Sequence, residues 1–230
     1  MLQQLKLMPC GHNKFGLSIT LDNKTLMQTI GNALRRTLAI NIEGYVVIGI
    51  GINGFCDELG KMDGIKEDVI EVINNIKQLE FMCHDGRRVF KVIINTSKIG
   101  NFLARHIPLP NGLSILNPNQ YICNLGIGTR LRLELVVACG IGYLTASEVQ
   151  DKFSHYLDRC LALDVDFNPI KRVSFRMIEY EFNMQSQEEG ELMIETNGSI
   201  DVVEAILRCC GILIRDLDSI ERTLSALLGC

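Results

Sequence analysis

The sequence predicts an α+β fold with a long helix near the C-terminal end of its 230 residues. Three amphipathic helices are separated by several segments whose apolar residues alternate as they do in strands. Helices and strands do not alternate regularly, which argues against a parallel sheet built from βαβ units. Hydrophobic residues make up 47% of the chain, enough for a buried core in one large domain or two small ones.

The first helix is predicted over residues 24–40. Arg35 and Arg36 project away from its apolar stripe, so two adjacent guanidinium groups lie on the outer face of a packed helix. From spacing alone, a solvated surface is the simpler interpretation of this pair. The stripe itself, which we expect to be buried, consists of Leu26, Ile30, Ala33, Leu34 and Leu38.

The second helix is predicted over residues 64–79, with Asp63 as its N-cap. Glu67 and Asp68 fall in the first turn and Lys77 in the last, the arrangement that the helix dipole favours. The expected buried face consists of Ile65, Val69, Val72, Ile73, Ile76 and Leu79.

The third helix begins after Asp201, which together with Glu204 resembles an acidic capping box. Its apolar residues are spaced alternately by three and four positions over more than three heptads. Such a helix is about 40 Å long, too long for a small core to cover, so it needs a partner. Packing within the chain and pairing with another chain both satisfy this need. The seam consists of Val203, Ile206, Cys210, Leu213, Leu217, Ile220, Leu224 and Leu227.

Strands are expected between the helices, at residues 45–52, 88–95, 130–137, 173–177 and 191–196. In the clearest of them, Leu131, Leu133, Leu135 and Val137 alternate with Arg130, Arg132 and Glu134. Asn197-Gly198 is a favourable turn before the last helix.

Composition narrows the function. The net charge of −4 argues against an autonomous nucleic-acid binder. The nine cysteines are irregularly spaced, which favours free thiols in a reducing compartment over a disulfide framework. We find no targeting segment and no membrane-length apolar run, so no membrane partner is expected.

One glycine-rich segment has the spacing of a dinucleotide-binding motif. Gly49-Ile50-Gly51-Ile52-Asn53-Gly54 matches G-x-G-x-x-G and follows an apolar run. The required helix does not begin at the last glycine, and no strand ends in an acid about 20 residues further on. A bulge or turn in a strand is the better interpretation.

Other catalytic chemistry is equally unsupported. Cysteines and histidines form no recognisable zinc set. Asp164 and Asp166 are the nearest approach to a polymerase-type acidic pair, and a solvated loop explains them. We therefore expect no catalytic residue, no metal ligand and no cofactor in this chain.

Several motifs, in one order along the chain, resemble the alpha subunit of bacterial and plastid RNA polymerase. The first is Thr29-Ile30-Gly31-Asn32-Ala33-Leu34-Arg35-Arg36-Thr37-Leu38, which is similar to the signature helix of that family. The others are residues 64–68 with 75–77, Pro118 and Cys123 within residues 117–125, Gly140-Ile141-Gly142-Tyr143, residues 167–173 and residues 195–201.

The resemblance implies a discontinuous dimerisation subdomain, residues 1–42 and 172–230, and an inserted α+β subdomain, residues 43–171. It implies that two copies dimerise through the first and last helices, with Leu34, Leu38 and the seam at the interface. The dimer would be the platform for the beta and beta-prime subunits, which supply catalysis and hold Mg²⁺. Arg36 and Arg35 would contact the beta subunit, and Lys77 would lie near a large-subunit contact. Contact with DNA would be indirect, through the complex.

The chain also departs from the family. The approach to the first helix, residues 22–28, is not glycine-rich, and Ile141 stands where relatives carry a basic residue. Relatives continue into a small DNA-binding domain, which we expect to be absent after Cys230. This drift favours a plastid-encoded protein of the stroma, with the bacterial cytoplasm as the alternative. Two other functions stay open: an NAD(P)- or nucleotide-binding enzyme that uses residues 49–54, and a structural homodimeric adaptor.

Overall fold

The computed structural model describes residues 2–11, 13–21, 23–52, 64–182 and 185–228. It confirms the predicted α+β class and divides the chain into two units, each with its own core. The first unit, called here the terminal unit, comprises Met1–Ile42 and Asn168–Cys230, and the second, the inserted unit, comprises Glu43–Phe167. The chain thus returns to the terminal unit at Asn168 rather than at Arg172, which lies inside a strand. No helix in the described part of the chain is long and apolar enough to span a membrane.

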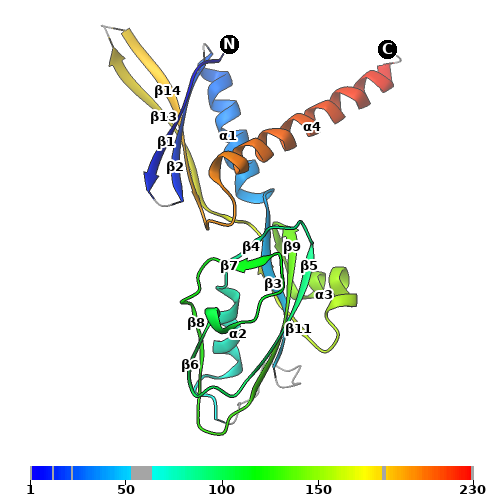
Figure 1. Ribbon diagram of the computed structural model, residues 1–230. Helices are drawn as coiled ribbons and strands as arrows, with labels where there is room; N and C mark the ends of the chain where they lie inside the picture. Colours follow the sequence, from blue (N-terminus) through cyan, green and yellow to red (C-terminus); the bar gives the residue numbers. More distant parts are fainter. Residues whose placement is uncertain (1, 12, 22, 53–63, 183–184, 229–230) are drawn as a thin grey trace. The chain divides into compact units, whose positions relative to one another are not determined.

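The terminal unit contains a four-stranded antiparallel sheet (Figure 1). Its strands, in spatial order, are β1 (Leu2–Gly11), β2 (Lys14–Leu21), β14 (Gln185–Thr196) and β13 (Ile170–Phe182). In β14, Leu192 and Ile194 are buried and alternate with the partly exposed Glu191, Met193 and Glu195, so one face of the sheet is apolar. Strands β13 and β14 include the predicted segments 173–177 and 191–196, whereas the hairpin of β1 and β2 was not predicted.

Helix α1 (Lys24–Ile40) covers the apolar face of this sheet and has the predicted bounds. The Asn23 side chain caps it by accepting a hydrogen bond from the Leu26 amide at 3.0 Å. The predicted stripe is partly wrong, because Leu26 and Ile30 are 48% and 36% exposed. The face that packs on the sheet is displaced around the helix by about one residue, and its buried residues are Met27, Gly31, Leu34, Thr37 and Leu38.

Helix α4 (Val202–Leu228) is the long predicted helix. Asp201 Oδ1 accepts hydrogen bonds from the amides of Val203 and Glu204, at 2.9 and 3.4 Å, and so caps its first turn. The Glu204 side chain accepts from Arg208 Nε at 2.7 Å, one helical turn further on. Asp201 therefore acts as the predicted N-cap.

The inserted unit is built around the antiparallel sheet β11-β3-β9-β5. These four strands are β3 (Glu43–Ile52), β5 (Val89–Thr96), β9 (Leu131–Ile141) and β11 (Leu161–Ala162). Three two-stranded sheets complete it: β4 (Phe81–Cys83) with β7 (Leu113–Ile115), β6 (Gly100–Leu103) with β8 (Tyr121–Leu125), and β10 (Tyr143–Leu144) with β12 (Val165–Asp166). The helices are α2 (Val69–Lys77), α3 (Ala146–Phe153) and two 3-10 turns at Ala104–His106 and Ser154–Tyr156.

Helix α2 begins later than predicted, at Val69, with Asp68 as the N-cap that accepts from the Glu71 amide at 2.7 Å. The expected cap, Asp63, lies outside the described residues. Glu67 is bonded to β8 and is not part of the helix, because its carboxylate accepts hydrogen bonds from the Tyr121 hydroxyl and from the Asn124 amide. Burial opposes ionisation of this carboxyl, but the two hydrogen bonds outweigh it and lower the Glu67 pKa.

The glycine motif lies in strand β3, and the dinucleotide interpretation is not supported. The pairing of β3 with β9 is irregular between Val47 and Gly49, which is the bulge that the sequence favours. A Cβ on Gly49 would lie 2.2 Å from Leu157 Cδ2, so close packing explains this glycine. Gly51 is also within the strand, and Asn53 and Gly54 lie outside the described residues.

Candidate subunit interface

The signature helix is held against the sheet by a close contact between a glycine and an aromatic ring. A Cβ on Gly31 would lie 2.2 Å from two ring atoms of Phe175 on β13. The same ring packs on Gly190 of β14, where a Cβ would lie 2.9 Å from it. Two glycines thus leave the space that Phe175 fills, and this contact sets the height of α1 above the sheet.

Arg35 and Arg36 lie on the side of α1 that this packing leaves outward. Arg35 is half-buried and Arg36 is exposed. Neither guanidinium forms a hydrogen bond or ion pair with another of the described residues. Five N–H donors in a fixed planar fork are therefore available at Arg36 for a carboxylate or carbonyl of another molecule.

The C-terminal end of α1 is tied to the segment that re-enters the unit. Asn168 Nδ2 donates to the carbonyl of Ala39 at 2.6 Å, and Asn168 Oδ1 accepts from the Ile170 amide at 3.0 Å. Pro169 then accepts a hydrogen bond from the Asn197 amide at 2.9 Å, next to the turn before α4. Two family-like segments, residues 167–173 and 195–201, thus fix the end of the arginine-bearing helix.

Helices α1 and α4 pack together inside the terminal unit. The Cys209 thiol is fully buried and donates to the Leu34 carbonyl at 3.6 Å. Burial raises the pKa of this thiol to about 12, so it stays protonated and acts as a small apolar residue. Leu34 and Leu38 are 6% and 0% exposed within this same core. In the single chain they therefore support α1 from beneath, and their expected place at the dimer interface stays a prediction.

The first half of α4 has two apolar faces. One packs on the core of the unit through Val202, Ala205 and Cys209, with Ile206, Cys210 and Leu213 partly buried beside them. The other faces outward and consists of Val203, Leu207 and Ile214, which are 44%, 62% and 58% exposed. Leu207 and Ile214 were not predicted as part of an apolar face, because a single heptad seam assigns a helix only one apolar side.

The second half of α4 has no cover within the described chain. From Ile214 to Leu227 every residue is exposed. Leu217, Ile220, Leu224 and Leu227, all of the seam, are 53% to 77% exposed. They continue the face that Leu213 and Ile206 present to the core about one and three turns before Leu217, so this side of the helix extends past the end of its own core (Figure 1).

The remaining candidates lie in the inserted unit. Lys77 is exposed in the last turn of α2. Asp164 Oδ1 accepts from the Ala146 amide at 2.6 Å and so supports the start of α3. Within the described ranges, no group of three or more His, Cys, Asp or Glu side chains could hold a metal ion.

Comparisons with known proteins agree with this architecture. Residues 47–168, just over half of the chain, match the family profile of the RNA polymerase Rpb3/RpoA insert domain. The chain belongs to this family of RNA polymerase subunits. The matched residues nearly coincide with the inserted unit, Glu43–Phe167, so that unit is the insert domain.

A bacterial relative extends the likeness beyond the insert domain. The DNA-directed RNA polymerase subunit alpha of Cytophaga hutchinsonii is 34% identical over 189 residues, which is 81% of this chain. An aligned region of that length includes residues outside the insert domain, so the terminal unit shares the alpha-subunit likeness. The alignment covers 57% of the relative, so the chain spans little more than half of its length.

Proposed function

We propose that this alpha-type subunit forms a homodimer that serves as the assembly platform for the large subunits of a DNA-directed RNA polymerase. The observation that carries the proposal is the uncovered second half of α4. Four seam residues there expose apolar side chains along nearly three turns, more than isolated surface leucines would explain. An apolar face that continues a buried one indicates that another chain covers it.

A two-fold dimer would satisfy both uncovered faces at once. In an isologous interface the same patch is used by both copies, so the overhanging half of one α4 can lie on the partner's first half. The partner offers Leu207 and Ile214 of α4 and Leu26 and Ile30 of α1, all exposed. The dimer then buries apolar side chains that the single chain leaves in water.

Sedimentation of charged variants tests the dimer. Leu217→Glu with Leu224→Glu should give a monomer at concentrations where the unmodified chain is dimeric, because two buried charges per chain oppose association. The helix should still fold, since both side chains are exposed in the single chain. Ser219→Glu, in the same exposed stretch of α4 but outside the seam, is the matched control and should stay dimeric. A dimer that persists in the double variant would refute this interface.

Arg36, with Arg35 beside it, is the proposed contact for the beta subunit. Because α1 is fixed at both its sheet face and its end, the exposed Arg36 projects from an ordered backbone, and only its side chain has to become ordered when it binds a carboxylate. Arg36→Ala should abolish capture of the beta subunit, and Arg36→Lys should restore it in part, since lysine keeps the charge without the planar fork. Both variants should still sediment as dimers. Full capture by Arg36→Ala would exclude this contact.

Lys77 is a secondary candidate for contact with a large subunit, supported by its exposure at the end of α2. Lys77→Glu should weaken assembly with beta-prime or beta without changing the dimer. If the reconstituted complex forms equally well with Lys77→Glu, this assignment fails.

The proposed compartment is the plastid stroma, with the bacterial cytoplasm as the alternative. Sequence drift from the family pattern supports the plastid, and the bacterial relative supports only the broader, bacterial-type class of polymerase. Affinity purification from the source organism tests both the complex and its compartment. Recovery of two large subunits from a plastid fraction is the expected result, and recovery of this chain as a dimer without them would favour a structural adaptor.

A further inference from the structure

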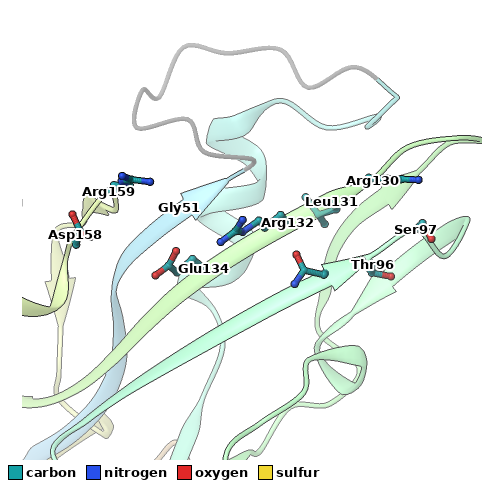
Figure 2. A pocket seen from close by; sticks show the side chains of 10 residues that line it. Gly51, Thr96, Ser97, Arg130, Leu131, Arg132, Glu134, Asp158 and Arg159 are labelled. Atoms are coloured by element: carbon teal, nitrogen blue, oxygen red, sulfur yellow. The ribbon is translucent and has the colours of Figure 1, made fainter.

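A polar groove lies on the outer face of the main sheet of the insert domain (Figure 2). It encloses about 840 Å³ and is lined by the end of β5, the start of β9 and the loop before β11. Three arginines, Arg130, Arg132 and Arg159, share this lining with Glu134 and Asp158. All of its lining residues belong to the inserted unit, whereas the dimer proposed above uses α1 and α4 of the terminal unit.

Strand geometry explains why the charges of β9 gather in the groove. Leu131 and Leu133 are 1% and 0% exposed on the core side, so Arg130, Arg132 and Glu134 face the opposite side. Gly51 of β3 pairs with Glu134 and offers no side chain, which leaves backbone as part of the floor. Figure 2 shows Arg132 and Glu134 between the loop that carries Arg159 and the strand end that carries Thr96.

The chemistry of the lining selects an acidic ligand but disfavours nucleic acid. Guanidinium groups bind carboxylates and phosphates through paired hydrogen bonds. Glu134 and Asp158 would repel a uniformly charged phosphate backbone, and none of the described lining residues is aromatic, so bases find no stacking surface. A peptide suits this mixed lining, because its acidic side chains can face the arginines while its amides donate to the carboxylates.

The spacing of the arginines indicates the form of that peptide. Arg130 directly precedes β9 and Arg132 is its second residue, so their Cα atoms are about 7 Å apart, and both side chains are exposed. In an extended peptide, side chains two residues apart have the same separation and the same direction. We propose that this groove binds an extended acidic segment of a partner protein, with two carboxylates in an acidic-x-acidic pattern against Arg130 and Arg132. This inference is independent of the assembly role.

Fluorescence anisotropy with the purified chain and short labelled peptides tests the proposal. A Gly-Ser-flanked Glu-Val-Glu peptide should bind, and binding should weaken as salt is raised. The corresponding Gln-Val-Gln peptide should bind at least about tenfold more weakly, as should a peptide with adjacent glutamates that cannot face both arginines. Arg130→Gln and Arg132→Gln should each weaken binding by about tenfold.

Lys91→Gln is the matched control. Lys91 is exposed on β5, on the same outer face of the same sheet, but does not line the groove. Its substitution removes the same charge and should leave affinity unchanged. Thermal unfolding checks the fold of each variant, and Arg130→Gln alone suffices if Arg132→Gln is destabilised.

Three results would overturn the proposal. No binding of Glu-Val-Glu at millimolar concentration removes it outright. An equal loss with Lys91→Gln shows attraction to general surface charge rather than a groove. Tighter binding of an oligothymidylate or of inorganic triphosphate than of the peptide assigns the groove to phosphates instead. Sedimentation of Arg130→Gln separates these failures from the assembly role, since the dimer should persist in every case.

Discussion

The contact between Gly31 and Phe175 predicts that the substitution Gly31→Ala, which adds one methyl group, lowers the stability of the chain. In Gly31→Ala the new Cβ would lie 2.2 Å from the ring, 1.2 Å short of the 3.4 Å at which ordinary contact begins. The ring cannot retreat toward the sheet, because Gly190 lies there and a Cβ at that position is already 2.9 Å from it. Helix α1 must therefore rise from the sheet or the ring must leave its position.

Two opposing effects, helix propensity and steric overpacking, determine how much Gly31→Ala changes the free energy of unfolding. Alanine is favoured over glycine inside a helix by about 1 kcal/mol. Overpacking a tight core contact costs about 1–3 kcal/mol. We expect the steric term to win, since the clash involves a rigid ring with backbone on both sides, which gives a net loss of up to about 2 kcal/mol. Gly211→Ala in α4 adds the same methyl where no heavy atom lies within 4 Å, so it should be neutral or stabilising by up to about 1 kcal/mol.

Urea unfolding followed by circular dichroism, at one fixed protein concentration, measures the difference. Phe175→Leu provides the internal test, because Gly31→Ala should cost less in that background, with a coupling energy of about 1 kcal/mol or more. Gly31→Ala should also weaken capture of the beta subunit, since lifting α1 moves Arg36. If Gly31→Ala stabilises the chain as much as Gly211→Ala does, the packing argument is refuted.

Three further predictions follow from single contacts. Asp201→Ala removes the cap of α4 and should cost about 1 kcal/mol of unfolding free energy, measured by urea titration. Glu67 has a lowered pKa in the folded chain, so its contribution to stability is present above the unfolded pKa near 4.5 and is lost as pH falls through the folded value. The free energy of unfolding should therefore drop less on acidification in Glu67→Gln than in the unmodified chain. An equal drop would show that the hydrogen bonds from Tyr121 and Asn124 to Glu67 do not stabilise its ionised form. Cys209 should resist iodoacetamide at pH 8 until the chain unfolds, whereas exposed Cys10 should react at once, as peptide mass spectrometry would show.

The sequence predicted elements well where local signals and tertiary packing agree. Leu131 to Val137 alternate clearly, and the core side of β9 is buried as expected. The bounds of α1 were also predicted. The start of α2 was not, since Ile65 fits the helical period while Gly64 has φ +77° and Glu67 is engaged by β8. Periodicity cannot reveal either constraint.

Other elements were missed for identifiable reasons. Strand β1 is an edge strand whose described side chains, residues 4–10, are all exposed, so it lacks the alternation that marks a half-buried strand. Helix α3 carried a usable signal: Thr145 and Glu148 form a full capping box in the structure. The groove at Arg130 and Arg132 needed the structure, because Arg159 and Gly51 reach it from other elements.

The exposed apolar residues of α1 and α4 share one physical cause. By their spacing, Leu26 and Ile30 were expected on a buried stripe, and Leu217 and Leu224 on a seam that needs a partner. All four are exposed in the single chain. Gly31, by contrast, is buried although it contributes nothing to an apolar stripe, because its value lies in the space it leaves for Phe175. Periodicity reports every apolar side chain that is protected from water in the working molecule, whichever chain protects it. A disagreement between a periodic pattern and the burial seen in one chain therefore marks surface that a partner should cover. On α1 and α4 these disagreements fall on the faces to which the proposed dimer assigns contacts.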